Sequence, residues 1–97
     1  MCNNSFAKLI IMEISVELTL APLQDDFKKP IKDFIVELRK SKFKVIENPL
    51  STHIYGEYKS LMNFLTKSIE KSLFDQKSVI INIKILKNNR SGYNPNF

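Results

Sequence analysis

Two strand-like runs carry hydroxyl, carboxylate and aromatic groups next to a turn, at residues 16–23 and 48–58. Glu17 and Thr19 stand in the first run, and Tyr55 stands in the second. A strand that only builds a core has no need of such groups. Together the two runs therefore indicate a site that binds something, and they carry no sign of reaction chemistry.

The sequence offers little support for catalysis. It has no glycine-rich phosphate loop, no nucleophile elbow and no spaced set of metal ligands. His53 is the single histidine, so this chain alone cannot form a histidine-based triad or a metal cluster. Cys2 is the single cysteine, it has no positioned base, and it cannot form an internal disulfide. We expect a protein that is not an enzyme and that needs no metal or cofactor.

Hydrophobic periodicity predicts four strands and two helices. Apolar and polar residues alternate over residues 14–21, and Pro22 ends that strand because proline cannot donate to a ladder. Apolar residues recur at helical spacing over residues 27–38 and 61–73, with Pro30 in the first turn of the first helix, where a missing N–H costs little. The other strands are residues 42–48, 51–57 and 79–85. The apolar stripes are Phe27, Ile31, Phe34, Ile35 and Leu38 in the first helix, Leu61, Phe64, Leu65, Ile69 and Leu73 in the second, and Val79, Ile81, Ile83 and Ile85 in the last strand.

This order of elements predicts an α+β protein with the ferredoxin-like βαββαβ fold. Right-handed crossovers place both helices on one face of a four-stranded antiparallel sheet, with the first and third strands as central neighbours. The chain of 97 residues is long enough for one such domain. We expect it to span residues 12–86, between a loose N-terminal tail at 1–11 and a polar, disordered C-terminal tail at 87–97.

The sheet face away from the helices then collects the polar members of each strand. If Ile54 points into the core, Glu17, Thr19, His53 and Tyr55 lie close together, with Asn82 on the flanking strand. The full predicted set is Ser15, Glu17, Thr19, Ser51, His53, Tyr55, Glu57, Ile80, Asn82 and Lys84. Two copies of the domain packed through this face would form a half-wet dimer interface, and the pattern alone leaves open whether a ligand lies there.

The net charge of +5 and the pI of about 9.4 raise the question of nucleic-acid binding. The lysines of the two predicted helices are interleaved with acidic residues, as on an ordinary solvated helix surface, and there is no aromatic strand motif of an RNA-binding sheet. RNA binding through these lysines therefore stays a weaker alternative. No apolar run is long enough to span a membrane and residues 1–12 do not resemble a signal peptide, so we expect a cytoplasmic protein.

Three segments, residues 15–23, 49–58 and 79–85, resemble the YkoF-like thiamine-binding family and its small single-domain relatives. The likeness covers roughly residues 13–86. It consists of a strand that ends in Pro-Leu, a Ser-Thr-x-Ile-x-Gly-Glu segment and the last strand, in the same order and at the same spacing. Gln24 departs from the pattern, because the family usually has glycine after Pro-Leu, and the tandem members hold two such domains in one chain.

The resemblance implies a ferredoxin-like domain that binds thiamine or its hydroxymethylpyrimidine part without catalysis and works as a homodimer or homotetramer. Tyr55 would stack on the pyrimidine ring. Glu17 would be the main polar anchor. Together with Thr19, Ser51, Thr52 and Asn82 it would form hydrogen bonds to the amino group and the ring nitrogens of the pyrimidine. The competing hypothesis is a ferredoxin-like structural or regulatory oligomerisation module that has no small-molecule ligand.

Overall fold

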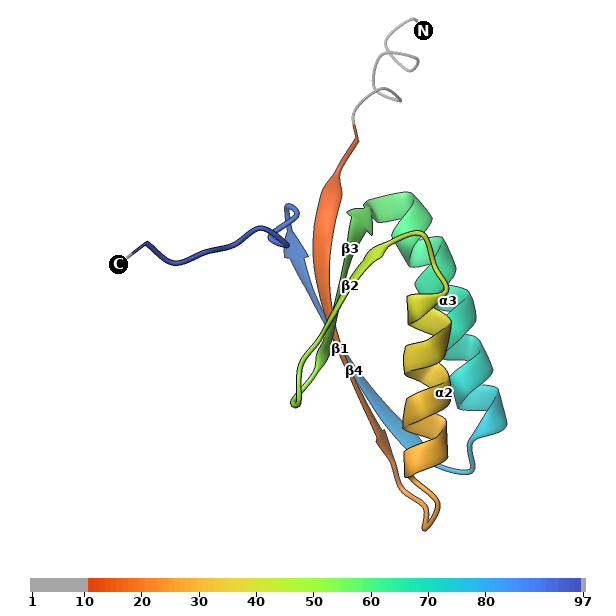
Figure 1. The fold of residues 1–97 in the computed structure, drawn as a ribbon. Coiled ribbons are helices and arrows are strands. Elements are labelled where there is room, and N and C mark those ends of the chain that lie inside the picture. Colours follow the sequence, from red (N-terminus) through yellow and green to blue (C-terminus); the bar gives the residue numbers. More distant parts are fainter. Residues whose placement is uncertain (1–10, 97) are drawn as a thin grey trace, which may run out of the picture.

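The computed structural model describes residues 11–96, and all structural statements below refer to that range. Four strands and two helices follow one another in the predicted order (Figure 1). The strands are β1 (Glu13–Pro22), β2 (Lys44–Glu47), β3 (Thr52–Glu57) and β4 (Val79–Lys87), and the helices are α2 (Lys28–Arg39) and α3 (Tyr58–Asp75).

The strands form one antiparallel sheet in the order β2-β3-β1-β4, and both helices lie on the same side of it (Figure 1). This is the ferredoxin-like α+β fold, and β1 and β3 are its central neighbours, as the sequence predicts. In the β1–β3 register Glu17 is opposite His53 and Val16 is opposite Ile54. Since directly opposite residues share a face, the register fixes which side chains meet on each side of the sheet.

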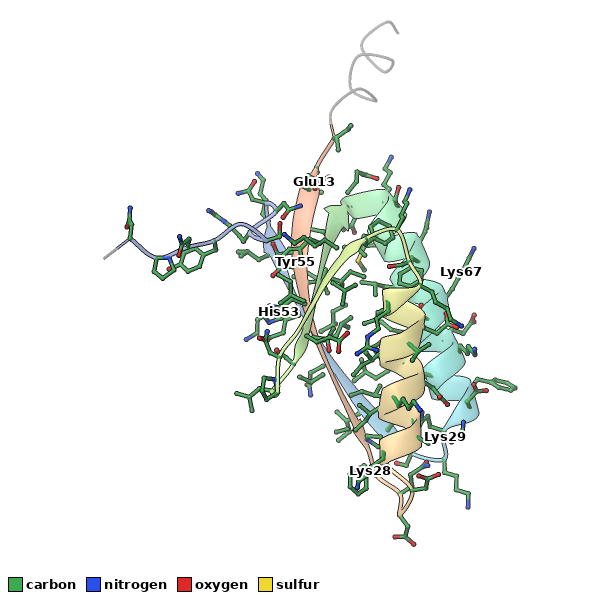
Figure 2. All side chains as sticks on the ribbon, in the orientation of Figure 1. Glu13, Lys28, Lys29, His53, Tyr55 and Lys67 are labelled. Carbon is green, nitrogen blue, oxygen red and sulfur yellow. The ribbon has the colours of Figure 1, made fainter. Side chains whose placement is uncertain are left out.

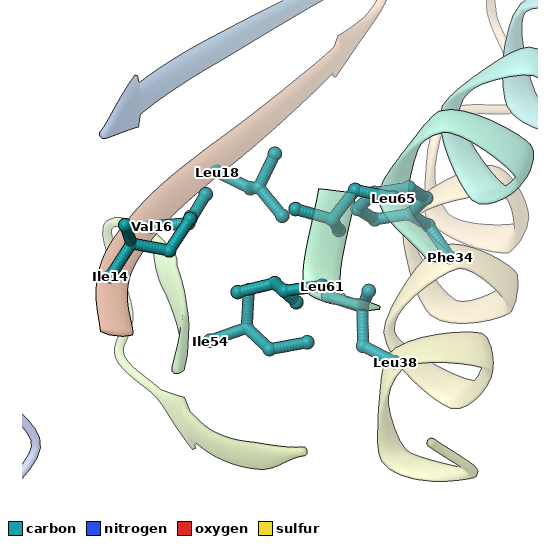
Figure 3. Close-up of a cluster of buried hydrophobic side chains, with 8 residues drawn as sticks. All are labelled: Ile14, Val16, Leu18, Phe34, Leu38, Ile54, Leu61 and Leu65. Carbon is teal, nitrogen blue, oxygen red and sulfur yellow. The ribbon is translucent and has the colours of Figure 1, made fainter. Parts of the chain in front are cut away.

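The hydrophobic core lies between the helices and the central strands (Figure 3). Val16 from β1 and Ile54 from β3 meet Leu38 from α2 and Leu65 from α3, and all four are almost fully buried. Ile54 therefore points into the core, which leaves His53 and Tyr55 on the opposite face, called here the open face. The complete core cluster is Ile14, Val16, Leu18, Phe34, Leu38, Ile54, Leu61 and Leu65.

The junction between β3 and α3 is fixed by two neighbouring residues. The Glu57 carboxylate caps α3 by accepting hydrogen bonds from the backbone N–H groups of Lys59 and Ser60, both at 3.0 Å. Gly56, just before it, lies against the Phe43 ring, which in turn contacts the Phe64 ring at a centroid distance of 5.8 Å. The sequence analysis placed Glu57 on the open face, whereas the structure uses its side chain as a helix cap.

The outer half of β4 departs from the predicted core. The β1–β4 register places Ile83 and Ile85 on the helix side, as the alternation predicts. Nevertheless, 41% of the Ile83 surface and 47% of the Ile85 surface are exposed. The strand is at the edge of the sheet, and the helices cover the central strands rather than this edge (Figure 1). The predicted apolar face of β4 is therefore only partly buried.

The buried side of α3 also differs from the predicted stripe. The helix buries Leu61, Leu65, Ser68 and Ser72, whereas Leu73 is largely exposed. The serines face α2, where they line a cavity of about 420 Å³ together with Phe34 and Glu37. Because successive helical residues are about 100° apart, Leu73 is turned away from α2, toward the β4 side of the domain.

Candidate functional site

Three side chains meet on the open face where β1 and β3 pair. The Ser51 hydroxyl donates a hydrogen bond to the Glu17 carboxylate at 3.0 Å and lies 3.1 Å from His53 Nε2. His53 Nε2 is 3.3 Å from the same carboxylate oxygen, Glu17 Oε2. Strand pairing explains this arrangement, because Glu17 and His53 are opposite each other and Ser51 precedes His53 by two residues.

Tyr55 extends this group along β3. Its hydroxyl oxygen lies 3.3 Å from His53 Nδ1, and the two rings meet edge to face. His53 therefore has polar neighbours at both ring nitrogens, which hold the ring in place. Figure 2 shows His53 and Tyr55 on the side of the sheet opposite the helices. We call Glu17, Ser51, His53 and Tyr55 the open-face cluster.

Glu17 is the anionic centre of the open-face cluster. The hydrogen bond from Ser51 is the main cause that lowers the pKa of its carboxyl group, with further contributions from His53 and Lys84. Lys84 Nζ lies 3.6 Å from Glu17 Oε1, on a side chain that is almost fully in solvent. The carboxylate is thus ionised near neutral pH, and among the described residues Lys84 is the only lysine or arginine within 4 Å of it.

The end of the chain covers one end of the open face. After β4, Asn88 adopts a positive φ of 84°, and its carbonyl oxygen accepts a hydrogen bond from the Ser15 hydroxyl at 2.8 Å. The Arg90 N–H donates to the same hydroxyl, also at 2.8 Å. Ser15 is opposite Tyr55 in the register, and both side chains are buried. The open-face cluster is therefore closed at its Tyr55 end and accessible at its Glu17 end.

Thr52 lies on the other side of the sheet. It is opposite Leu18 of the core and is buried beneath the helices, so the structure does not bring it to the open-face cluster. There it lines a small cavity of about 190 Å³ between α2 and the β2–β3 turn, together with Leu18, Phe34 and Leu50. Alternation along residues 51–57 places Thr52 on the same face as Ile54, and the structure agrees; Thr52 entered the predicted site only through the family resemblance.

Thr19 and Asn82 are the remaining predicted site residues. They are opposite each other in the β1–β4 register, one step beyond the pair of Glu17 and Lys84 on the same face. Neither side chain makes a hydrogen bond within the described residues. Thr19 and Ser51 also line the 190 Å³ cavity at the end of the sheet. Five of the six predicted residues thus lie along the open face, and only Thr52 does not; Thr19 and Ser51 adjoin the cavity that Thr52 lines.

His53 is the site residue that the sequence analysis left out of its ligand-binding set. The alternation along residues 51–57 did place it on the open face, but a single histidine gave no further sign of a role. Its importance comes from cross-strand pairing with Glu17, which a one-dimensional pattern does not show. The resulting arrangement does not match a Ser-His-Asp relay, because Ser51 and Glu17 approach the same ring nitrogen, Nε2.

The arrangement offers a fixed set of donors and acceptors to a small polar ring. Glu17 accepts, the Tyr55 and Ser51 hydroxyls both donate and accept, and the imidazole does one at each nitrogen. Within residues 11–96, no group of three or more histidine, cysteine or acidic residues could hold a metal ion.

Over the same residues, no helix is long and apolar enough to cross a membrane. The labelled lysines of the two helices, Lys28, Lys29 and Lys67, lie away from the open-face cluster (Figure 2).

Comparison with known proteins finds similar structures only. No family model and no curated protein matches the sequence. The chain is similar to protein SP2199 from Streptococcus pneumoniae, with 25% identity, a TM-score of 0.74, and coverage of 80% of this chain and 89% of that one.

Two further structures share the fold at lower identity. A protein from Thermotoga maritima, described as a putative thiamine biosynthesis/salvage protein, has a TM-score of 0.70 and 17% identity over 84% of this chain and 89% of its own. A domain of unknown function from Bacillus cereus, of the type DUF77, has a TM-score of 0.66 and 16% identity over 89% of this chain and 80% of its own. At these identities the likeness establishes the fold.

Proposed function

We propose that this protein binds thiamine or its hydroxymethylpyrimidine part on the open face, without catalysing a reaction. The observation that carries the proposal is the Glu17 carboxylate, oriented by Ser51 and His53 on an accessible part of the sheet. A binding protein needs such a fixed polar group to orient its ligand, and the rest of the site only has to match its shape.

The chemistry of an aminopyrimidine fits this cluster. Its amino group would donate to Glu17, and a ring nitrogen would accept a hydrogen bond from the Ser51 hydroxyl or from His53. Tyr55 would border the ring on one side. Asn82 and Thr19, whose side chains make no hydrogen bond within residues 11–96, would reach the far end of the ligand.

Charge supports the same choice of ligand. The thiazolium ring of thiamine is positive, and at about 4 Å with an effective dielectric of about 20 one carboxylate attracts it by about 4 kcal/mol before desolvation. Lysines on the helix side of the sheet lie beyond a Debye length of about 8–10 Å and are largely screened. The net charge of +5 therefore does not prevent a cation from binding beside Glu17.

The comparisons support the proposal through one neighbour. The Thermotoga maritima protein with this fold is described as a putative thiamine biosynthesis/salvage protein. The sequence resemblance to the YkoF-like family, carried by the two segments that supply Glu17 and Ser51, favours the same ligand class.

Isothermal titration calorimetry with thiamine and with free hydroxymethylpyrimidine tests the proposal. We expect Glu17→Gln to weaken binding of both ligands by about 10- to 100-fold, because it removes a charged hydrogen-bond acceptor. Thr52→Val is the matched control, since Thr52 lies on the helix side and should leave the affinity unchanged. Loss of binding in Thr52→Val with full binding in Glu17→Gln would move the site to the 190 Å³ cavity. Absence of heat with both ligands at millimolar concentration would refute the function.

Lys84→Gln separates the two ligands. The lysine competes with a cationic ligand for Glu17, so its removal should tighten thiamine binding by a few-fold. The neutral pyrimidine should bind as it does to the unaltered protein. An equal change for both ligands would mean that Lys84 contacts the pyrimidine rather than competing for the carboxylate.

A second function, an oligomerisation module without a small-molecule ligand, is favoured by one observation. Ile80 and Leu86 of β4 lie on the open face, and about half of each side chain is exposed. This hypothesis predicts an assembly that is indifferent to thiamine and that is broken by a charge at Ile80. The calorimetric experiment distinguishes it from the first proposal, because only the first predicts heat.

A further inference from the structure

The outer edge of β4 is the least covered apolar region of the sheet. Within the described residues β1 is its only strand neighbour, so one row of its backbone groups has no ladder partner. The strand has nine residues and contains neither proline nor glycine. Its exposed apolar residues lie on both faces of the sheet, at Ile80, Ile83, Ile85 and Leu86. A long, apolar strand edge is a template for pairing with another strand.

Two hydrogen bonds reveal which backbone groups of β4 point outward. The Asn88 N–H donates to the Glu13 carbonyl at 2.9 Å, and the Leu23 N–H donates to the Ser78 carbonyl at 2.8 Å. In an antiparallel ladder the residues that bond to a given neighbour alternate along the strand. The even-numbered residues of β4 therefore bond to β1. The odd-numbered residues, 79 to 87, direct their N–H and C=O groups away from the sheet.

The sequence of β4 is self-complementary about its central residue. If a second copy pairs antiparallel with Ile83 opposite Ile83, Ile81 is opposite Ile85 and Ile80 is opposite Leu86. Asn82 is then opposite Lys84, so polar residues also meet polar residues. All nine residues are used, and each hydrogen-bonded pair consists of two odd-numbered residues, as the outward groups require.

Every other two-fold antiparallel register of β4 gives a shorter ladder or places an apolar side chain opposite a polar one. An axis at Asn82 shortens the ladder to seven residues and places Ile80 opposite Lys84. An axis at Lys84 also leaves seven residues, and it places the two lysines opposite each other. An axis at Ile81 shortens the ladder to five residues and places Ile80 opposite Asn82. An axis at Ile85 also leaves five residues and places Lys84 opposite Leu86. Register is determined by such patterns wherever a face is apolar.

The helix side of the same edge supports pairing with a second copy. Met62, Ile69 and Leu73 form an apolar stripe on the flank of α3. This flank faces away from α2, because Lys71 on the other flank lies 3.6 Å from Glu37 of α2. In a two-fold pair the stripes of both α3 helices would border the row formed by Ile83 and Ile85. The apolar surface that the helices leave uncovered in one copy would be covered by the other.

Lys84 is the residue on this edge that most opposes pairing, since edge lysines commonly prevent association. Here its ammonium group lies 3.6 Å from the Glu17 carboxylate of its own chain, which offsets the charge. Across the axis its neighbour is the neutral Asn82, not another lysine. The edge therefore carries a balanced rather than a repulsive charge pattern.

We propose that two copies of this chain join through antiparallel β4–β4 pairing centred on Ile83, forming a continuous eight-stranded sheet. Both open-face clusters then lie on the same side of that sheet, with their β1 strands separated by three strand spacings, about 14 Å. Asn82 of each copy comes to stand beside Lys84 of the other, at the border of its open-face cluster. The proposal differs from face-to-face packing of two open faces and does not depend on the ligand.

Sedimentation equilibrium of the full chain, without ligand, provides the first test. We expect a dimer at about 100 μM, and we expect Ile83→Lys to weaken self-association at least about 100-fold while the far-ultraviolet circular dichroism stays native. Leu50→Lys is the matched control, because Leu50 is an exposed apolar residue at the β2–β3 turn, on the opposite edge of the sheet. It should stay dimeric. A monomeric wild-type protein would overturn the proposal.

Amide hydrogen exchange followed by nuclear magnetic resonance tests the register. In the dimer both the even and the odd amides from 79 to 87 should be protected, whereas Ile83→Lys should lose protection at the odd amides only. A dimer whose odd amides exchange rapidly would mean that the copies meet through another surface, and would also overturn the proposal. Neither readout involves thiamine, so failure of this interface and failure of the proposed function are distinguishable.

Discussion

Val16 on β1 is flanked by an isoleucine on each neighbouring strand, and the two isoleucines share its face of the sheet but differ in burial. On β3 its partner is Ile54, which is fully buried, and on β4 its partner is Ile85, which is 47% exposed. All three side chains are on the helix side. The difference therefore comes from the helices, which lie over β3 and β1 but leave the outer part of β4 uncovered (Figure 1).

The comparison shows that alternation assigns a face but does not measure burial. An apolar residue on the inner face of an edge strand is buried only if another layer extends that far. We therefore expect the centre of the sheet to determine the folding stability of a single chain. The β4 edge remains available for pairing with a second chain.

The largest expected effect comes from truncating the two partners of Val16. Ile54→Ala should lower the free energy of unfolding by about 2–5 kcal/mol, because it leaves a cavity in a fully buried position. Ile85→Ala, measured at a concentration where the protein is monomeric, should cost less than about 1 kcal/mol, since half of the side chain already contacts water. Urea denaturation gives both values. Equal losses would mean that β4 is covered after all, and the comparison between centre and edge would fail.

A smaller effect is expected from adding one methyl group at the tightly packed end of β3. In Gly56→Ala the new Cβ would lie 2.5 Å from Cδ1 of the Phe43 ring. The ring must move and disturb its contact with Phe64, which should cost about 1–3 kcal/mol. Gly92→Ala is the control, because no atom of the described residues lies within 4 Å of its added Cβ, and a change within about 0.5 kcal/mol is expected. A stabilised Gly56→Ala would show that the ring has room to turn aside.

The smallest expected effect concerns the cap of α3 and appears as a dependence on pH. Backbone N–H groups of Lys59 and Ser60 lower the pKa of Glu57 below its ordinary value of 4.5. A lowered folded-state pKa means that the ionised group stabilises the fold above pH 4.5 and loses this contribution as the pH falls through the folded-state value. Glu57→Gln should therefore be less stable than the wild type at pH 7, with the gap closing as the pH falls below 4.5.

Thermal unfolding at pH 7, 5 and 3.5 provides the measurement for this cap. Glu70→Gln, an exposed position on the same helix, serves as the control and should run parallel to the wild type at all three pH values. A gap between Glu57→Gln and wild type that stays constant with pH would show that the side chain acts through packing rather than through its charge.

The sequence predicted the fold because each local signal agreed with the others. Alternation at Val16, the break at Pro22 and the helical spacing of Phe34 and Leu38 all hold in the structure. The exposure of Ile85 escaped prediction, because it depends on how far the helices extend over the sheet, which a periodic pattern does not show. Alternation did place Thr52 on the face of Ile54, and only the family resemblance had drawn it into the predicted site.

The candidate site was predicted in part. Glu17, Ser51 and Tyr55 could be placed together because strand order and alternation bring them to one face. The role of His53 within that group needed the register between β1 and β3, which fixes its partner as Glu17. The covering of Ser15 by the backbone at Asn88 and Arg90 had no sequence signal, because it depends on one backbone angle after β4.

That angle makes the accessible area of the open face sensitive to a residue outside the sheet. Asparagine tolerates a positive φ better than most side chains, and a β-branched residue there would be strained. Replacing Asn88 by valine would therefore favour an extended path and release the last residues from the sheet. Water would then reach Ser15 and Tyr55, and more of the open face would become accessible without any change in the strands themselves.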